Sequence, residues 1–255
     1  MEIGSIVVRK KYNGDIIFKI VNITDNNALL IGIFIRLIAD APISDLEVVL
    51  DSDIERNNLE ELNYKNRIIE QYKGKIAHLT GKILHYDSDK EYLDKCLDLY
   101  KSIGLYAKGI FDKEGNIKDR ILNDINIYRP NIVVLTGHDS YNGKGVNDIN
   151  NYRNTSNFMD SIIKIREKYS LDEIYVFAGA CGSNLEALIA SGANSASAIN
   201  REKIEAYDPA LIAILAAITP FNQIIDIDIM DKVSKLKKRA IGGVESFGKM
   251  RLLVR

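Results

Sequence analysis

The sequence predicts an α/β protein with a doubly wound, mostly parallel sheet, preceded by a small β unit. From Ile76 onward, short apolar runs alternate with amphipathic stretches, and such β–α alternation is typical of a parallel sheet covered by helices. Before residue 55, short β-rich runs are separated by polar turns such as Asn13-Gly14-Asp15, which favour a small antiparallel barrel of the SH3 type. We therefore expect an SH3-like β-barrel over 1–55, a linker over 56–75 and an α/β domain over 76–255.

The elements follow from local composition. Strands of the N-terminal unit are expected where Ile and Val are frequent, at 5–9, 15–23 and 28–38, and the charged, Asn-rich residues 51–75 are expected to form a linking helix or loop. Bounded apolar runs predict strands of the larger sheet at 81–87, 105–111, 131–137, 173–179, 194–199 and 222–229. Helical spacing of apolar residues predicts helices at 89–103, 116–127, 156–168, 183–191, 207–217 and 230–239.

Composition excludes several classes of protein. The net charge of −1 over 255 residues gives no general attraction to nucleic acid or to an anionic membrane. The longest apolar stretch, 210–218, is too short to span a bilayer, and the first residues turn polar too soon for a signal peptide. The two cysteines lie far apart in sequence, which favours reduced thiols. We expect a cytoplasmic protein without membrane or nucleic-acid partners.

Two apolar runs each end on a reactive side chain. His138 follows the run Ile132-Val133-Val134-Leu135, and Cys181 follows Ile174-Tyr175-Val176-Phe177. Catalytic groups of open α/β sheets gather outside the carboxyl ends of the strands. Because the two strands belong to consecutive β–α units, we expect them to be neighbours and to bring His138 and Cys181 together as base and nucleophile.

The residues around Cys181 favour a reactive thiol. Ser183 and Glu186 have the spacing of a capping box, so a helix is expected to begin at Ser183 and to lower the pKa of the thiol just before it. Gly179 and Gly182 would allow a substrate carbonyl close to the backbone. Cys96, by contrast, lies on an apolar helical stripe and is expected in the core.

Histidines are few, so the choice of base is narrow. Besides His138, the chain has His78 in a charged stretch and His85 near another strand end. No His-x-x-x-His or Cys-x-x-Cys spacing is present, so we predict neither a metal site nor a cofactor.

The order of these residues points to one architecture. No histidine follows His138, which excludes α/β-hydrolases, class I glutamine amidotransferases and papain-like enzymes, where the histidine comes after the nucleophile. The order His-then-Cys, each after an apolar block, resembles the caspase-like peptidases. In that group the backbone N–H after the histidine and that of the cysteine form the oxyanion hole. Here Gly137-His138-Asp139 departs from the usual His-Gly, so Asp139 could either supply its N–H or orient His138, with Gly137 and Gly182 as further candidates around the hole.

A closer resemblance covers nearly the whole chain. The segments GSIVVRKKYNGDIIFKI, IRLIADAPISDLEVV, KILHYDSDKEYLDKCLDLYKSIGL, VVLTGHDSY, NNYRNTSNF and VFAGACGSNLEALIASGAN, with the tail GGVESFGKMR, resemble the YabG family of sporulation-specific proteases. The resemblance implies a peptidase of the mother cell that processes spore coat and germination-related proteins after basic residues, with association with the coat as a further expectation. It places the active-site residues on His138 and Cys181.

A basic substrate side chain in a closed pocket needs a carboxylate partner. Acidic candidates near the expected strand ends include Asp139, Asp148, Glu205, Asp208 and Glu245, with Asp208 favoured because it follows the fifth strand. Two alternatives stay open: a non-catalytic spore assembly factor that binds protein or nucleic acid, and a Cys–His hydrolase of a non-peptide substrate.

Overall fold

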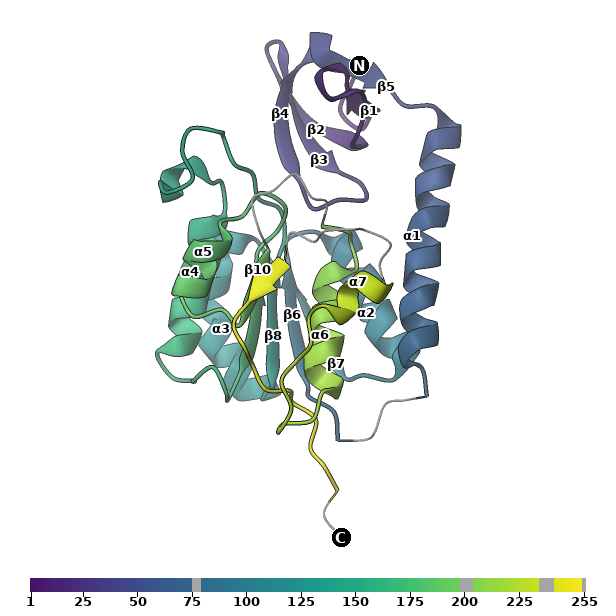
Figure 1. The fold of residues 1–255 in the computed structure, drawn as a ribbon. Helices are drawn as coiled ribbons and strands as arrows, with labels where there is room; N and C mark the ends of the chain where they lie inside the picture. Colours follow the sequence, from purple (N-terminus) through teal and green to yellow (C-terminus); the bar gives the residue numbers. More distant parts are fainter. Residues whose placement is uncertain (75–78, 198–203, 234–240, 254–255) are drawn as a thin grey trace.

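The computed structural model describes residues 1–74, 79–197, 204–233 and 241–253, and contains two β-sheets (Figure 1). The N-terminal sheet is antiparallel, in the order β4-β3-β2-β1-β5. Its strands are β1 (Ile6–Arg9), β2 (Phe18–Thr24), β3 (Asn27–Gly32), β4 (Ile38–Pro42) and β5 (Leu46–Val48). Alternate apolar side chains of this sheet form a small core of their own, in which Val7, Phe18 and Leu30 are fully buried or nearly so.

The second sheet has six strands in the order β11-β10-β9-β8-β6-β7. They are β6 (Ile83–Asp87), β7 (Ala107–Phe111), β8 (Ile132–Thr136), β9 (Tyr175–Ala178), β10 (Ser195–Ser197) and β11 (Ile241–Gly243). All neighbours are parallel except β11, which pairs antiparallel with β10. The predicted α/β fold, with a mostly parallel sheet after a small antiparallel β unit, is confirmed.

Helices cover both faces of the larger sheet (Figure 1). One face carries α3 (Glu114–Tyr128), α4 (Thr155–Arg166) and α5 (Leu185–Ala190), and the other carries α1 (Asp51–Tyr72), α2 (Lys90–Ile103), α6 (Asp208–Ile218) and α7 (Ile229–Val233). The central strands β8 and β9 are buried on both faces, which explains why their sequences are apolar without alternation. No helix in the described parts of the chain is long and apolar enough to cross a membrane.

Two of the expected strands differ in the structure. Residues 222–228 form turns and loop with one isolated bridge between Ile224 and Phe247, and Ile229 begins α7, so the strand predicted over 222–229 is wrong and the edge position belongs to β11. The expected helix over 230–239 is represented by α7, and residues 234–239 of that expectation lie outside the described residues, as do 198–199 of the expected strand 194–199. The charged residues expected to link the two units form α1, which buries Tyr64, Ile68 and Tyr72.

The second difference bears on the site. Residues 28–38 were expected to form one strand, but β3 ends at Gly32 and β4 begins at Ile38. The residues between them leave the N-terminal sheet and reach the larger one, where Ile35 forms a bridge with Glu205 and Leu37 forms one with Asp139. The N-terminal sheet therefore contacts the carboxyl edge of the parallel sheet through this segment, 33–37.

Candidate active site

Cys181 lies in the tight turn between β9 and α5, and its side chain is only 5% exposed. Gly179 and Gly182 on either side of it have φ angles of +107° and +83°, a conformation that side-chain-bearing residues rarely adopt. A Cβ at Gly182 would also meet the backbone of Ser140 at 3.2 Å. The thiol lies against Ile204, whose N–H donates a hydrogen bond to Sγ at 3.3 Å. The two glycines thus allow the backbone conformation of the turn, and the 204–206 segment covers the thiol.

His138 lies in the corresponding turn after β8, the strand beside β9. The register pairs Leu135 with Ala178, so both turns leave the same edge of the sheet. The ring lies near that of Tyr92, with centroids 5.8 Å apart, and Nε2 lies 3.7 Å from the Asp89 carboxylate. Among the described residues, buried Nε2 has no partner at hydrogen-bond distance. The structure therefore places the two predicted residues on neighbouring turns, with Asp89 as the acid beside the imidazole.

Asp139 has a different set of partners. Its buried carboxylate accepts hydrogen bonds from the backbone N–H groups of Ser140 and Asn154 and from the hydroxyls of Thr155 and Ser183, at 2.5–2.8 Å. Burial raises the pKa of Asp139, while these donors oppose the rise. Asp139 thus connects the His138 turn, the start of α4 and the Cys181 turn.

Gly137 lies against two polar side chains. A Cβ there would collide with Glu114 and Ser88. The carboxylate of Glu114 also accepts the backbone N–H of His138 at 3.0 Å, so it fixes the turn that carries the histidine. This partner of His138 has no distinctive sequence signal, because Glu114 lies in an ordinary first turn of α3.

The segment 33–37 passes directly over Cys181. The backbone N–H of Cys181 donates to the carbonyl of Arg36 at 3.1 Å, and the N–H of Arg36 donates to the carbonyl of Ile204 at 3.3 Å. On the far side, Ile38 N–H donates to the carbonyl of Asp139 at 3.3 Å. A stretch of the chain itself is therefore bound by main-chain hydrogen bonds between the Cys181 turn, the 204–206 segment and the His138 turn.

The side chain of Arg36 is completely buried in a closed pocket. Its guanidinium donates to the Asp87 carboxylate at 2.6 Å and to the carbonyl of Ala206 at 3.1 Å, and it lies 4.6 Å from the centre of the Tyr92 ring. Cys96 lies at the base, with Sγ 3.7 Å from the guanidinium. Asp87 ends β6, which pairs with β8, so this acidic pocket is beside the His138 turn.

Burial is the largest influence on the pKa values of the ionisable groups in the site. It raises the pKa of the Cys181 thiol to about 12 and lowers that of His138 to about 4, although Asp89 acts to raise the latter. Burial also raises the pKa of Asp87 to about 6, opposed by Arg36. The expectation that a helix start acidifies Cys181 is therefore not met in this closed arrangement. At neutral pH the thiol and the imidazole are both uncharged.

The helix after Cys181 begins later than expected. The sequence predicted a start at Ser183, but α5 begins at Leu185 with Asn184 as its N-cap, whose side chain accepts from Ala187 N–H at 3.0 Å. Ser183 instead accepts from the N–H of Ala180 and donates to Asp139. The hydroxyl thus stabilises the turn rather than the helix.

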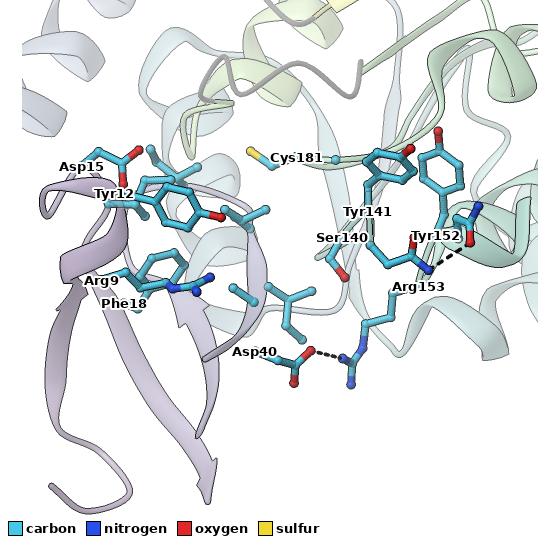
Figure 2. A pocket seen from close by; sticks show the side chains of 18 of the residues that line it. Arg9, Tyr12, Asp15, Phe18, Asp40, Ser140, Tyr141, Tyr152, Arg153 and Cys181 are labelled. Carbon is cyan, nitrogen blue, oxygen red and sulfur yellow. Dashed lines mark hydrogen bonds and ion pairs between the residues drawn. The ribbon is translucent and has the colours of Figure 1, made fainter. Parts of the chain in front are cut away.

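A cavity of about 590 Å³ opens beside the thiol, between the N-terminal sheet and the larger sheet. Figure 2 shows Cys181 between Tyr12 and Asp15 on one wall and Tyr141 and Tyr152 on the other. The rings of Tyr141 and Tyr152 are stacked, with centroids 5.0 Å apart, and the far rim is crossed by an ion pair between Asp40 and Arg153. Cys181 and Gly182 are among the residues that line this cavity.

The acidic candidates lie in three different settings. Asp208 is buried in the first turn of α6, where it accepts from the Tyr64 hydroxyl at 2.7 Å and from Glu205 N–H at 2.9 Å. Asp148 is exposed and accepts from Asn150 N–H at 3.0 Å, and Glu245 is exposed after β11. None of these three contacts the Arg36 guanidinium within the described residues, whereas Asp87, which sequence reasoning missed as an acid of the site, does.

The remaining candidates from the sequence are the other two histidines and the second cysteine. His85 is buried and its Nδ1 lies 3.0 Å from the Tyr100 hydroxyl, while Cys96 is fully buried as expected. His78 lies outside the described residues. Among the described residues, no group of three or more His, Cys, Asp or Glu side chains could hold a metal ion.

Comparison with known proteins gives a single consistent result. The family model described as YabG peptidase U57 matches residues 2–255. The sporulation-specific protease YabG of Bacillus subtilis (strain 168) is 35% identical over 280 aligned positions, which cover 98% of this chain and 97% of that protein. No solved structure matches.

Proposed function

The chain belongs to the YabG peptidase U57 family, and from this membership and the geometry above we propose a cysteine endopeptidase that cuts polypeptides after arginine or lysine. Cys181 is the nucleophile and His138 the base. The observation that carries the proposal is a peptide segment bound at Cys181, with the arginine carbonyl on the Cys181 N–H and the arginine side chain on Asp87.

The dyad acts on a substrate bound as Arg36 is bound. A proton passes from Cys181 to the imidazole, and the thiolate attacks the carbonyl carbon of the basic residue. Because Nε2 faces Asp89, Nδ1 is the nitrogen available to Cys181. The imidazolium then donates its proton to the leaving amine, and water hydrolyses the thioester.

The Cys181 N–H is proposed as one donor of the oxyanion hole, since it already binds a peptide carbonyl at 3.1 Å. The N–H of Asp139, the residue after His138, is the proposed second donor, as in the caspase-like group. Gly137 and Gly182 provide the space that both turns need. The carboxylate of Asp139 is a positioning group for the two turns, and Asp89 orients the imidazole.

Asp87 is the proposed specificity residue. A guanidinium that leaves water must be paired and hydrogen-bonded, and the pocket supplies one carboxylate, one carbonyl and one aromatic face. Asp208 contributes through the position of the 204–206 segment, because it accepts the N–H of Glu205.

The family relationship supports a biological setting. The B. subtilis relative is named a sporulation-specific protease, so we propose protein substrates of the developing spore, coat and germination-related proteins among them. The proposed location is the mother-cell cytoplasm, followed by association with the coat.

The test compares the wild-type chain with Cys181→Ala, His138→Ala and, as a matched control, Ser102→Ala on the surface of α2. Each is incubated with an unfolded protein, and the new N-termini are mapped by mass spectrometry. We expect cuts after Arg and Lys with wild type and Ser102→Ala and at least a thousandfold loss in both site variants, because nucleophile and base act as one unit.

Full activity of a correctly folded Cys181→Ala chain, checked by circular dichroism, would refute the dyad. Cuts without preference for basic residues would refute the assigned pocket. Absence of any protein cleavage would favour the non-catalytic assembly factor or a hydrolase of non-peptide substrates.

A further inference from the structure

We propose that Tyr92 couples recognition of the substrate's basic side chain to catalysis, because its ring packs against both the cation in the Asp87 pocket and the imidazole of His138. This inference rests on the proposed function, since it concerns the same pocket and the same base. It adds a positioning residue to the site and predicts that the substrate's cation raises the rate of the chemical step as well as the affinity.

The ring of Tyr92 is shared by the pocket and the base. The guanidinium carbon of Arg36 lies 4.6 Å from the ring centroid, inside the range in which a cation is attracted to an aromatic face. The imidazole of His138 packs against the same ring, with centroids 5.8 Å apart and the planes inclined at 41°. Lys95 also approaches this ring, at 5.6 Å from its centroid, but its ammonium is bound by Glu61. The guanidinium is therefore the nearer of these two cations.

The position of this ring is fixed from two directions. Tyr92 belongs to the first turn of α2 and is buried. Its hydroxyl donates a hydrogen bond to the carbonyl of Gly32 at 2.9 Å, and its backbone N–H donates to the Asp89 carboxylate at 3.2 Å. A buried ring that is anchored at both ends has little freedom to turn. It therefore presents the guanidinium and the imidazole with a surface of fixed position.

A second link between the pocket and the base runs through hydrogen bonds at the connection between β6 and α2. The Asp87 carboxylate accepts from the Arg36 guanidinium through Oδ2 at 2.6 Å and from the backbone N–H of Asp89 through Oδ1 at 2.9 Å. The carboxylate of Asp89 in turn lies 3.7 Å from Nε2 of His138 and accepts the N–H of Tyr92. This connection and the first turn of α2 therefore carry the acid of the pocket, the acid beside the base and the shared ring.

The remaining residue of the connection reaches the backbone of the base. The Ser88 hydroxyl donates to the carboxylate of Glu114, which also accepts the N–H of His138 at 3.0 Å. Three successive residues of the chain thus contact the pocket cation, the group that holds the His138 backbone and the His138 ring. A shift of this connection consequently moves the imidazole relative to Cys181.

A bound cation stabilises this arrangement. Asp87 is completely buried, and a buried carboxylate without a partner is costly. A substrate with an uncharged residue leaves Asp87 unpaired and the ring of Tyr92 without its cation, so the connection loses two of the contacts that fix it. Binding energy from the basic side chain is thereby used to set the geometry of the reacting groups. The expected consequence is an effect of the substrate charge on kcat in addition to its effect on KM.

The test measures kcat and KM separately for two matched fluorogenic peptides, with either arginine or its neutral isostere citrulline before the cleaved bond. Full-length wild type is compared with Tyr92→Phe, Tyr92→Leu and the matched control Tyr106→Leu, which alters an exposed tyrosine just before β7. Because Arg36 fills the pocket in this structure, the set is repeated in chains that also carry Arg36→Gln. The readout is the ratio of kcat on arginine to kcat on citrulline, since a general disturbance of the fold or of the imidazole lowers both and leaves the ratio unchanged.

Wild type should give a kcat ratio of about ten or more. Tyr92→Leu should bring the ratio to within about twofold of one, because the cation then no longer acts through the ring. Tyr92→Phe keeps the ring and should restore the ratio to within about threefold of the wild-type value. Tyr106→Leu should behave as wild type.

A wild-type ratio near one would overturn the proposal, and so would a ratio in folded Tyr92→Leu equal to that of wild type. A change in Tyr92→Leu that is confined to KM would also overturn it, because the ring would then bind the cation without acting on the imidazole. Folding is checked by circular dichroism. If Tyr92→Leu does not fold, ring-fluorinated phenylalanines at position 92 keep the shape and weaken the negative face of the ring. The ratio should then fall stepwise with the number of fluorines, and a constant ratio would reject the coupling.

The two proposals fail differently. Hydrolysis that depends on Cys181 but shows a kcat ratio independent of the residue at position 92 would leave the peptidase in place and reject the coupling. Absence of hydrolysis of both peptides in every chain, those with Arg36→Gln included, would reject the peptidase itself and the coupling with it.

Discussion

The backbone N–H of Cys181 and the carbonyl of Arg36 are joined by a hydrogen bond of 3.1 Å. This bond joins two residues that are far apart in sequence: Arg36 lies between two strands of the N-terminal sheet, and Cys181 follows a strand of the larger sheet. It places an arginine residue at the predicted nucleophile, and the side chain of that arginine reaches Asp87. The proposed nucleophile and the proposed pocket therefore share one bound arginine.

The pair Arg36–Asp87 should be strongly coupled in stability. In a Cys181→Ala background, which prevents cleavage, Arg36→Gln and Asp87→Asn should each lower the free energy of unfolding by about 3 to 5 kcal/mol, because each leaves a buried charge without its partner. The double variant should lose clearly less than the sum of the two. Urea denaturation of the four chains measures the coupling, and simple additivity would mean that the pair is not a functional unit.

Asp87 should also decide specificity. Once Arg36 is replaced by Gln, adding Asp87→Asn should reduce kcat/KM for an arginine peptide by roughly 30-fold or more, or about 2 kcal/mol. A peptide with norleucine in place of arginine should be affected far less. If both peptides lose activity equally, Asp87 supports the fold and does not read the substrate.

Asp89 and Asp139 should have separable effects. Asp89 raises the pKa of His138, so Asp89→Asn should move the limb of the pH–rate profile that His138 governs to lower pH. Asp139→Asn should lower kcat without moving that limb, since its carboxylate bonds to Ser140, Asn154, Thr155 and Ser183. A shift of the limb with Asp139→Asn would instead assign the orienting role to Asp139.

Acid should weaken the intact chain through His138. Burial lowers the pKa of His138 to about 4 from an ordinary value of 6.5, so between these values the unfolded state binds the proton and the folded state does not. Stability is therefore lost as the pH falls through this window, by at most about 3 kcal/mol. Burial raises the pKa of Asp87 to about 6, which acts in the opposite direction. The contribution of His138 is isolated as the difference between Cys181→Ala and Cys181→Ala/His138→Ala. A difference that stays constant from pH 7 to pH 4 would contradict it.

The sequence predicts the turns that carry His138 and Cys181 well because buried parallel strands leave a clear signal. β8 and β9 are continuous apolar runs that end at tight turns, so the positions of His138 and Cys181 follow from local pattern. Residues 222–229 instead alternate apolar and polar side chains, and the strand predicted there is wrong because tertiary packing makes turns in this stretch and gives the edge to the short β11.

The acidic pocket could not be predicted in the same way. In the stretch from Ile31 to Ile38, apolar residues around Arg36 are compatible with one continuous strand, and nothing local indicates that the chain leaves the sheet. Asp87 follows an apolar run, as many surface acids do. Its role as the partner of a buried guanidinium depends on Arg36, which lies 51 positions away in the sequence. Pairings between distant segments have no periodic signal in a single sequence.

Covalent labelling of Cys181 by a blocked arginine chloromethyl ketone tests the central claim most directly. The reagent is applied to Arg36→Gln, and its norleucine analogue, without the charge, is applied in parallel. We predict one adduct, located on Cys181 by peptide mass spectrometry, that forms at least tenfold faster with the arginine reagent and leaves the buried Cys96 unmodified. Equal rates with both reagents, or an adduct elsewhere than on Cys181, would contradict the account.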